Sequence, residues 1–121
     1  MAASAPHRHH RIDYIELAAP DLAAMKAFYG AAFGWTFTAY GPDYVGYSDG
    51  REGEAGGIRR AASVSRGGPL VILYSDDLEA TRARVREAGG TIAKDIFAFP
   101  GGRRFEFVDP AGNELAVWSE R

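Results

Sequence analysis

The sequence predicts an α+β fold in which two βαβββ modules form curled, mixed sheets around a cup-shaped cleft. Two observations predict it. A strand–helix–strand pattern occurs twice in the chain, and the same kinds of residue begin and end the helix in each copy. The aspartates expected to begin the two helices, Asp21 and Asp77, are separated by about half of the 121 residues. A spacing of this kind indicates a duplicated structural unit.

The first module is expected to start with a strand over residues 12–17, where apolar and polar side chains alternate. A helix should follow from Asp21, because an aspartate side chain accepts hydrogen bonds from the free amides of a first helical turn. Apolar residues then recur every three or four positions, which predicts one buried helix stripe; they are Leu22, Met25, Phe28, Tyr29, Ala32 and Phe33. Gly34 should end this helix, and residues 35–38, 44–47 and a short stretch near 58 are expected to be strands.

The second module repeats this order. An apolar, β-branched strand is expected over residues 70–74, and Asp77 is expected to cap the next helix. Its buried stripe comprises Leu78, Thr81, Val85 and Ala88. A glycine pair should end the helix at residues 89–90, before strands that start at 91, span 104–108 and span 114–118. The intervening residues 109–113 read as a turn, since proline presets one φ angle and glycine and asparagine tolerate positive φ.

Composition excludes several classes of protein. The net charge of −2 and the pI near 5.9 are unlike those of a nucleic-acid-binding domain. No run of about 18 apolar residues predicts a membrane span. The chain has no cysteine, which excludes disulfides and thiolate metal sites. We therefore expect a cytoplasmic protein with no nucleic-acid or membrane partner. Its single domain should span residues 11–121, with modules at about 11–60 and 69–119, after a disordered tail over residues 1–10.

Several motifs carry a family resemblance. They are Ala27-Phe28-Tyr29-Gly30 with Phe33-Gly34-Trp35, Glu87-Ala88-Gly89-Gly90, and Asp109-Pro110-Ala111-Gly112-Asn113-Glu114-Leu115. With them, residues 11–119 resemble the glyoxalase/bleomycin-resistance/dioxygenase superfamily, also called the vicinal oxygen chelate superfamily. The resemblance implies the fold above. It does not choose a reaction, because this superfamily includes isomerases, lyases, ring-cleaving dioxygenases, thiol transferases and drug-binding proteins. Function has to be argued from the site.

The resemblance also implies where a metal would be held. The corresponding positions in this chain are Tyr14, Leu70, Ala116 and a residue near Gly57 or Ile58. Leucine, alanine, glycine and isoleucine side chains have no donor atom, and neutral tyrosine is a poor ligand for divalent first-row metals. We therefore expect no metal at these positions and no other cofactor. A metal site rebuilt from other carboxylates remains an open alternative.

Strand periodicity predicts what occupies the cup instead. In the hairpin around residues 109–113, pairing places Glu106 beside Ala116 and Arg104 beside Trp118. Alternation then gathers six candidate residues on one concave face: Tyr14, Glu16, Arg104, Glu106, Glu114 and Trp118. Tyr47 joins them if its strand faces the same way. Phe105 and Phe107 should point to the opposite face, beneath the helix. A register slip of one residue would turn all of these side chains around.

These residues support two classes of function, and the sequence leaves open whether the protein is an enzyme. In the first, the cleft binds a small, ring-bearing organic molecule without converting it, and Tyr14, Tyr47, Arg104, Glu114 and Trp118 contact the ligand. In the second, Glu106 or Glu16 acts as general acid or base in an isomerase, lyase or hydrolase that uses no metal. A glyoxalase-like lyase with rebuilt metal ligands is a third possibility. We expect a homodimer in each case. The glycine-rich residues 49–68 read as a lid, a crossing segment or a linker.

Overall fold

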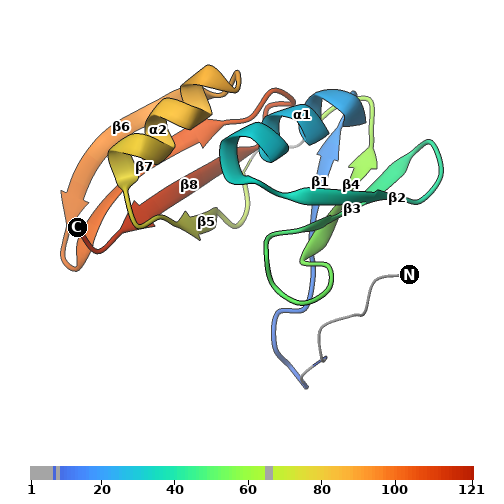
Figure 1. Cartoon of the computed structure of the whole chain (residues 1–121), viewed down its shortest axis with the longest axis horizontal. Helices are drawn as coiled ribbons and strands as arrows, with labels where there is room; N and C mark the ends of the chain where they lie inside the picture. The colour runs from blue at the N-terminus through green and yellow to red at the C-terminus, as the bar shows by residue number, and fades with distance from the viewer. Residues whose placement is uncertain (1–6, 8, 65–66) are drawn as a thin grey trace.

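The computed structural model describes residues 7, 9–64 and 67–121. The expected disordered tail lies mainly outside these residues, although His7 is described and its Nδ1 atom lies 2.5 Å from a carboxylate oxygen of Asp13. Two helices lie on one side of the molecule, above two four-stranded mixed sheets (Figure 1). This is the predicted α+β arrangement of two βαβββ units. In the described part of the chain, no helix has the length and apolar character needed to cross a membrane.

The first module contributes, in chain order, β1 (Ile15–Ala19), α1 (Leu22–Phe33), β2 (Thr36–Ala39), β3 (Tyr44–Ser48) and β4 (Gly56–Arg60). Its sheet has the strand order β1-β4-β3-β2, with β1 and β4 parallel. Asp21 caps α1 as predicted, by accepting a hydrogen bond from the Ala24 amide, and Gly34 ends it in the left-handed conformation. The first strand was predicted too early: it starts at Ile15, where pairing with β4 begins.

The second module contributes β5 (Val71–Tyr74), α2 (Leu78–Glu87), β6 (Thr91–Phe99), β7 (Gly102–Val108) and β8 (Glu114–Ser119). Its sheet has the order β5-β8-β7-β6, with β5 and β8 parallel. Asp77 caps α2 as predicted. The β6 strand begins at Thr91 as predicted but extends to Phe99, because it pairs with β7 through two register irregularities. Its sequence pattern gives no sign of these irregularities.

The pairing of β7 with β8 confirms the predicted register. Glu106 lies opposite Ala116, and Arg104 lies opposite Trp118. Phe105 and Phe107 are fully buried, and the Phe107 ring packs 6.0 Å from that of Phe28 on α1, measured between centroids. The face of this sheet opposite the helices therefore carries Arg104, Glu106 and Trp118, as strand periodicity predicts.

Helix α1 joins the two modules. Its Phe33 ring lies 5.7 Å from Phe107 of β7, and its Tyr29 hydroxyl donates a hydrogen bond to Asp109 after β7. From the same turn, the side-chain amide of Asn113 donates to the backbone oxygen of Ala18 in β1, at 2.9 Å. These contacts hold the ends of β1 and β8 together, so the outer strands β1 and β5 of the two sheets border a shared space.

Candidate functional site

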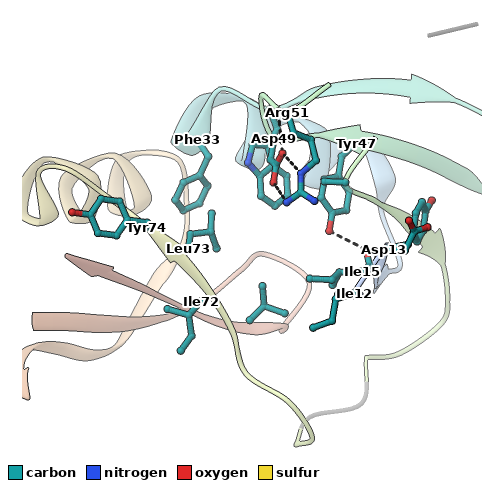
Figure 2. Close-up of a pocket in the computed structure, with 14 residues that line it drawn as sticks. Ile12, Asp13, Ile15, Phe33, Tyr47, Asp49, Arg51, Ile72, Leu73 and Tyr74 are labelled. Carbon is teal, nitrogen blue, oxygen red and sulfur yellow. Dashed lines mark hydrogen bonds and ion pairs between the residues drawn. The ribbon is translucent and has the colours of Figure 1, made fainter. Parts of the chain in front are cut away.

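A cleft of about 500 Å³ opens where residues 12–15, at the start of β1, face strand β5. In Figure 2 Ile72, Leu73 and Tyr74 of β5 lie on one side of an open space, with Phe33 near Leu73, and Tyr47, Ile15 and Ile12 lie across it. The lining is mostly apolar and aromatic, with three charged side chains; it comprises Ile12, Asp13, Tyr14, Ile15, Phe33, Trp35, Tyr47, Asp49, Arg51, Ala55, Val71, Ile72, Leu73 and Tyr74. We call this space the aromatic cleft. A concave, mainly apolar lining with a few polar groups is typical of a small-molecule site.

The wall of the aromatic cleft is built on a stack of three rings. Tyr47 lies parallel to Trp35 at 4.5 Å between centroids, and Trp35 lies parallel to Tyr29 at the same distance. The Tyr47 hydroxyl donates to the backbone oxygen of Ile15 at 2.9 Å, which fixes the ring across β4. Burial, followed by the negative charge of Asp49, raises the pKa of Tyr47 to about 12. The phenol is thus held neutral and oriented at ordinary pH.

Glycine at position 56 makes room for this ring. A Cβ atom there would lie 2.0 Å from the backbone oxygen of Ile15 and 2.5 Å from the Tyr47 hydroxyl. Both distances are far below van der Waals contact. The position of Tyr47 therefore depends on the absence of a side chain in β4.

An ion pair lies at the edge of the aromatic cleft. Arg51 donates to both carboxylate oxygens of Asp49, at 2.9 Å each. Burial raises the pKa of Asp49, but the hydrogen bonds from Arg51 outweigh it and hold that pKa below its ordinary value. The pair stays charged and places a cation and an anion beside a mostly apolar space (Figure 2).

A second cavity, of about 430 Å³, adjoins the first and shares Ile15 and Val71 as lining residues. Three of the predicted carboxylates, Glu16, Glu106 and Glu114, line it. We call this space the carboxylate cavity. The structure therefore brings together side chains from β1, β7 and β8 that the sequence placed on one face.

Tyr14 and Glu16 belong to a polar cluster on the face of the first sheet that lies opposite the helices, which we call the outer face of each sheet. The hydroxyls of Tyr14 and Tyr44 lie 2.6 Å apart, and Glu16 lies 3.5 Å from the Arg59 guanidinium. Burial, then hydrogen bonds with Tyr14 and Glu16, raise the pKa of Tyr44 well above its ordinary value. Tyr14 is 44% exposed and also borders the aromatic cleft, so its phenol is accessible there.

Arg104, Glu106 and Trp118 lie together on the outer face of the second sheet. A terminal nitrogen of Arg104 donates to Glu106 at 2.9 Å, and the side chains are 29% and 27% exposed. The Nε atom of Arg104 is buried and has no hydrogen-bond partner among the described residues. Trp118 packs edge-on against Tyr74, 5.0 Å away between centroids.

The structure places Tyr47 and Trp118 on different faces of their sheets, whereas the sequence left open that both line one concave face. Tyr47 turns toward the helix side of its sheet and stacks on Trp35, because Tyr44 and Gly46 take the outer positions of β3. Trp118 lies on the outer side of the other sheet and reaches the aromatic cleft only through Tyr74.

Sequence reasoning missed part of the site. Ile72, Tyr74 and Trp35 are predicted only as strand residues and Phe33 only as part of a buried helix stripe, yet all four line the aromatic cleft. Residues 70–74 are all apolar and do not alternate in sequence, and only the structure shows that Leu70, Ile72 and Tyr74 are exposed. Asp49 and Arg51 carried no recognisable signal, since they lie in a glycine-rich loop. That loop leads directly into β4, and residues 65–66 of the 49–68 segment lie outside the described residues.

The positions that the family resemblance assigns to a metal do not form a donor set. Ala116 is fully buried between its strand partners Ile72 and Glu106, and the Tyr14 phenol lies over Gly57. Across residues 7, 9–64 and 67–121, no three His, Asp or Glu side chains come together as a group that would hold a metal ion. The residues at these positions do not fit a divalent metal.

Comparisons with known proteins agree with this architecture. The family model described as Glyoxalase/Bleomycin resistance protein/Dioxygenase superfamily matches residues 11–117. The anthracycline biosynthesis protein DnrV of Streptomyces peucetius is 33% identical over 124 residues, which cover 87% of this chain and 45% of that protein. The chain thus spans about half the length of the curated relatives it matches.

Solved structures show the same fold. A glyoxalase/bleomycin resistance protein/dioxygenase family enzyme from Burkholderia phytofirmans PsJN matches with a TM-score of 0.78 and 18% identity, over 91% of this chain and 98% of that one. TioX from Micromonospora sp. ML1 matches with a TM-score of 0.69 and 21% identity, over 89% of this chain and 97% of that one.

Proposed function

We propose that this chain, which belongs to the Glyoxalase/Bleomycin resistance protein/Dioxygenase superfamily, binds a small ring-bearing organic molecule in the aromatic cleft without the family's metal. One observation carries the proposal: five aromatic side chains from both modules line a single concave space of about 500 Å³. These are Tyr14, Phe33, Trp35, Tyr47 and Tyr74. Flat side chains of this kind offer large contact areas to a planar ligand at low entropic cost.

The polar groups around the cleft give such a ligand an orientation. Arg51 and Asp49 lie at one edge, and the accessible phenol of Tyr14 can donate to a ligand oxygen. The carboxylate cavity adjoins the cleft through Ile15 and Val71, so a substituent on the ring system has room to extend toward Glu16 and Glu106. A cationic or hydroxyl-bearing substituent suits that cavity best.

The relative with 33% identity supports a ring-bearing ligand. DnrV is named for anthracycline biosynthesis, and anthracyclines contain fused rings. Because this chain corresponds to less than half of that protein, we transfer only the kind of ligand and not an activity.

Binding without turnover is favoured by the state of the carboxylates. The Glu16 side chain is 45% exposed, and Glu106 is ion-paired with Arg104. The surroundings of a general acid or base usually shield it from solvent and adjust its pKa to the reaction. Carboxylates that are solvated or paired with a cation serve more readily as recognition groups.

Isothermal calorimetry with a panel of planar ring compounds, an anthracycline among them, tests the proposal. Tyr74→Ala should weaken binding about tenfold or more, because it removes one aromatic wall. Tyr40→Ala is the matched control: Tyr40 is 49% exposed against 48% for Tyr74, but it does not line the cleft. Equal loss in both variants, or no binding by any compound, would overturn the proposal.

A second candidate function is metal-independent proton transfer by Glu106. The observation that favours it is the convergence of Glu106, Glu16 and Glu114 on one cavity. The test is exchange of α-hydrogens of a cyclic aryl ketone in D2O, followed by NMR. Catalysed exchange that Glu106→Gln abolishes would establish this function, whereas exchange at the buffer rate would exclude it for this substrate class.

We also propose that the chain forms a homodimer. Ile12, Tyr14, Leu70, Ile72 and Tyr74 are large apolar side chains that remain exposed around β1 and β5, the outer strands of the two sheets. Open sheet edges with apolar side chains favour pairing with a second copy. Sedimentation analysis should give a dimer at micromolar concentration, and Ile72→Glu should shift it toward monomer. A monomeric wild-type protein at high concentration would contradict this.

A further inference from the structure

The outer face of the second sheet carries two cations around one ring. The Lys94 ammonium lies 4.2 Å from the centroid of Phe97, and the Arg104 guanidinium carbon lies 5.3 Å from the same centroid. On that face Trp118 packs against Tyr74 at 5.0 Å and lies 6.3 Å from Phe99. We call Lys94, Phe97, Arg104 and Trp118 the cation–aromatic face.

Strand pairing explains why these residues meet. Phe97 lies opposite Arg104, and Arg104 in turn lies opposite Trp118, across three neighbouring strands. Lys94 lies opposite Glu106. A register irregularity between Lys94 and Phe97 breaks the usual alternation of β6, so both side chains reach the same face. Regular pleating would have sent residues 94 and 97 to opposite sides.

The charges on this face do not cancel. Glu106 bonds one terminal nitrogen of Arg104, while Lys94 has no carboxylate partner among the described residues. The buried Nε donor of Arg104 also lacks an acceptor there. The face therefore offers one surplus positive charge beside partly buried aromatic side chains. A solvated cation resting on a ring explains Lys94 alone, but not a second cation, Arg104, against the same ring.

We infer that the cation–aromatic face binds the anionic end of a planar aromatic ligand, an aromatic carboxylate or a group of the same charge. The ring would pack against Trp118 and the negative oxygens would be held by Lys94 and Arg104. Tyr74 lines the aromatic cleft and touches Trp118, so this face continues the cleft. To that extent the inference rests on the proposed function, and it adds that the ring-bearing ligand is an anion.

The test uses the two tryptophans of the chain, of which Trp35 lies in the aromatic cleft and Trp118 on the cation–aromatic face. A ¹⁵N–¹H NMR spectrum resolves one indole signal for each, and Trp118→Phe assigns them. The probes are 2-naphthoate, the neutral 2-naphthamide and the cationic 2-naphthylmethylamine. We expect 2-naphthoate to shift the Trp118 signal, with tighter binding than the other two.

Lys94→Gln should then weaken 2-naphthoate binding roughly fivefold, the size of one exposed ion pair, and leave 2-naphthamide unchanged. Lys26→Gln is the matched control, since Lys26 is the other lysine of the chain and lies exposed on α1. Arg104→Lys, which keeps the charge but removes the planar guanidinium that can donate to two oxygens at once, should weaken binding as well.

The outcomes separate this inference from the proposed function. Shifts of the Trp35 signal alone, with equal affinity for all three probes, would overturn the anion site and leave the aromatic cleft supported. Shifts of the Trp118 signal that depend on Lys94, without any change at Trp35, would support the anion site and count against the cleft. If Lys94→Gln and Lys26→Gln weakened 2-naphthoate binding equally, the attraction would be nonspecific and the inference would be overturned.

Discussion

The hydroxyl of Tyr29 donates a 2.9 Å hydrogen bond to the carboxylate of Asp109, and both residues are buried. Tyr29 belongs to α1 of the first module, whereas Asp109 begins the turn between β7 and β8 of the second. The other oxygen of Asp109 accepts three backbone amides of that turn, from Ala111, Gly112 and Asn113. One carboxylate thus shapes a turn and fastens the helix of the other module to it.

Tyr29→Phe should lower the free energy of unfolding by about 1–3 kcal/mol, because a buried carboxylate loses a donor. Tyr40→Phe is the control. It removes the same hydroxyl from a half-exposed ring that donates to Glu54, and it should cost less than Tyr29→Phe. Urea denaturation measures both. A loss for Tyr29→Phe no greater than that for Tyr40→Phe would show that the contact does not couple the modules.

Two glycine-to-alanine changes should act in opposite directions. Gly56→Ala places a methyl group 2.0 Å from the Ile15 oxygen and should destabilise the fold by about 1–3 kcal/mol or more. Gly30→Ala lies within α1, where the nearest atom is the Trp35 oxygen at 3.8 Å. It should stabilise by up to about 1 kcal/mol, through the higher helix propensity of alanine. Thermal unfolding of both variants checks the signs, and stabilisation by Gly56→Ala would refute the close approach of Tyr47.

Alkaline solution should destabilise the protein through its tyrosines. Burial, then the charge of Asp109, raises the pKa of Tyr29, and burial raises that of Tyr47 to about 12. An unfolded tyrosine has a pKa near 10, so the unfolded chain loses these protons first. Their stabilising contribution is complete below about pH 10 and is lost as pH rises through the folded values.

Urea midpoints measured between about pH 9 and pH 11.5 should therefore fall as the pH rises. Tyr47→Phe should flatten this dependence while lowering the midpoint at pH 9. If the urea midpoint of Tyr47→Phe fell equally steeply with pH, burial would not raise the pKa of Tyr47 in the folded protein.

Metal addition should leave the stability of the protein unchanged. Leu70 and Ala116 provide no ligand atoms, and the neutral phenol of Tyr14 is a poor metal ligand. A metal that binds only the folded state would raise the melting temperature by mass action. EDTA-treated protein titrated with Ni²⁺, Zn²⁺, Mn²⁺ and Fe²⁺ should show no stoichiometric shift. A saturable rise with one of these metals would instead identify rebuilt ligands, with Glu16, Glu106 and Glu114 as the first to mutate.

Much of the fold could be predicted because its determinants are local. The aspartates at positions 21 and 77 begin both helices, Gly34 ends the first, and the turn at residues 109–113 fixes the register of β7 and β8. That register placed Glu106 beside Ala116 correctly. Where determinants are not local, prediction failed: the length of β6 depends on irregular pairing with β7 rather than on its own pattern.

The candidate site could be predicted only one sheet at a time. Periodicity grouped Arg104, Glu106 and Trp118, since neighbouring strands of one hairpin set their faces. It could not reveal the aromatic cleft, because that space depends on how β5 approaches β1 across two sheets. The orientation of Tyr47 likewise follows from a stack on Trp35 and from a missing side chain at Gly56. Contacts between distant segments of this kind leave no periodic signal.

The most direct measurement of ligand binding in the aromatic cleft is the indole signal of Trp35 during titration with a planar ring compound. Trp35 stacks on Tyr47 and lines the cleft, so a bound ring changes its surroundings. We predict a saturable shift of the Trp35 signal that Tyr74→Ala weakens and Tyr40→Ala does not. A Trp35 signal that stays unchanged while other residues respond would contradict binding in this cleft.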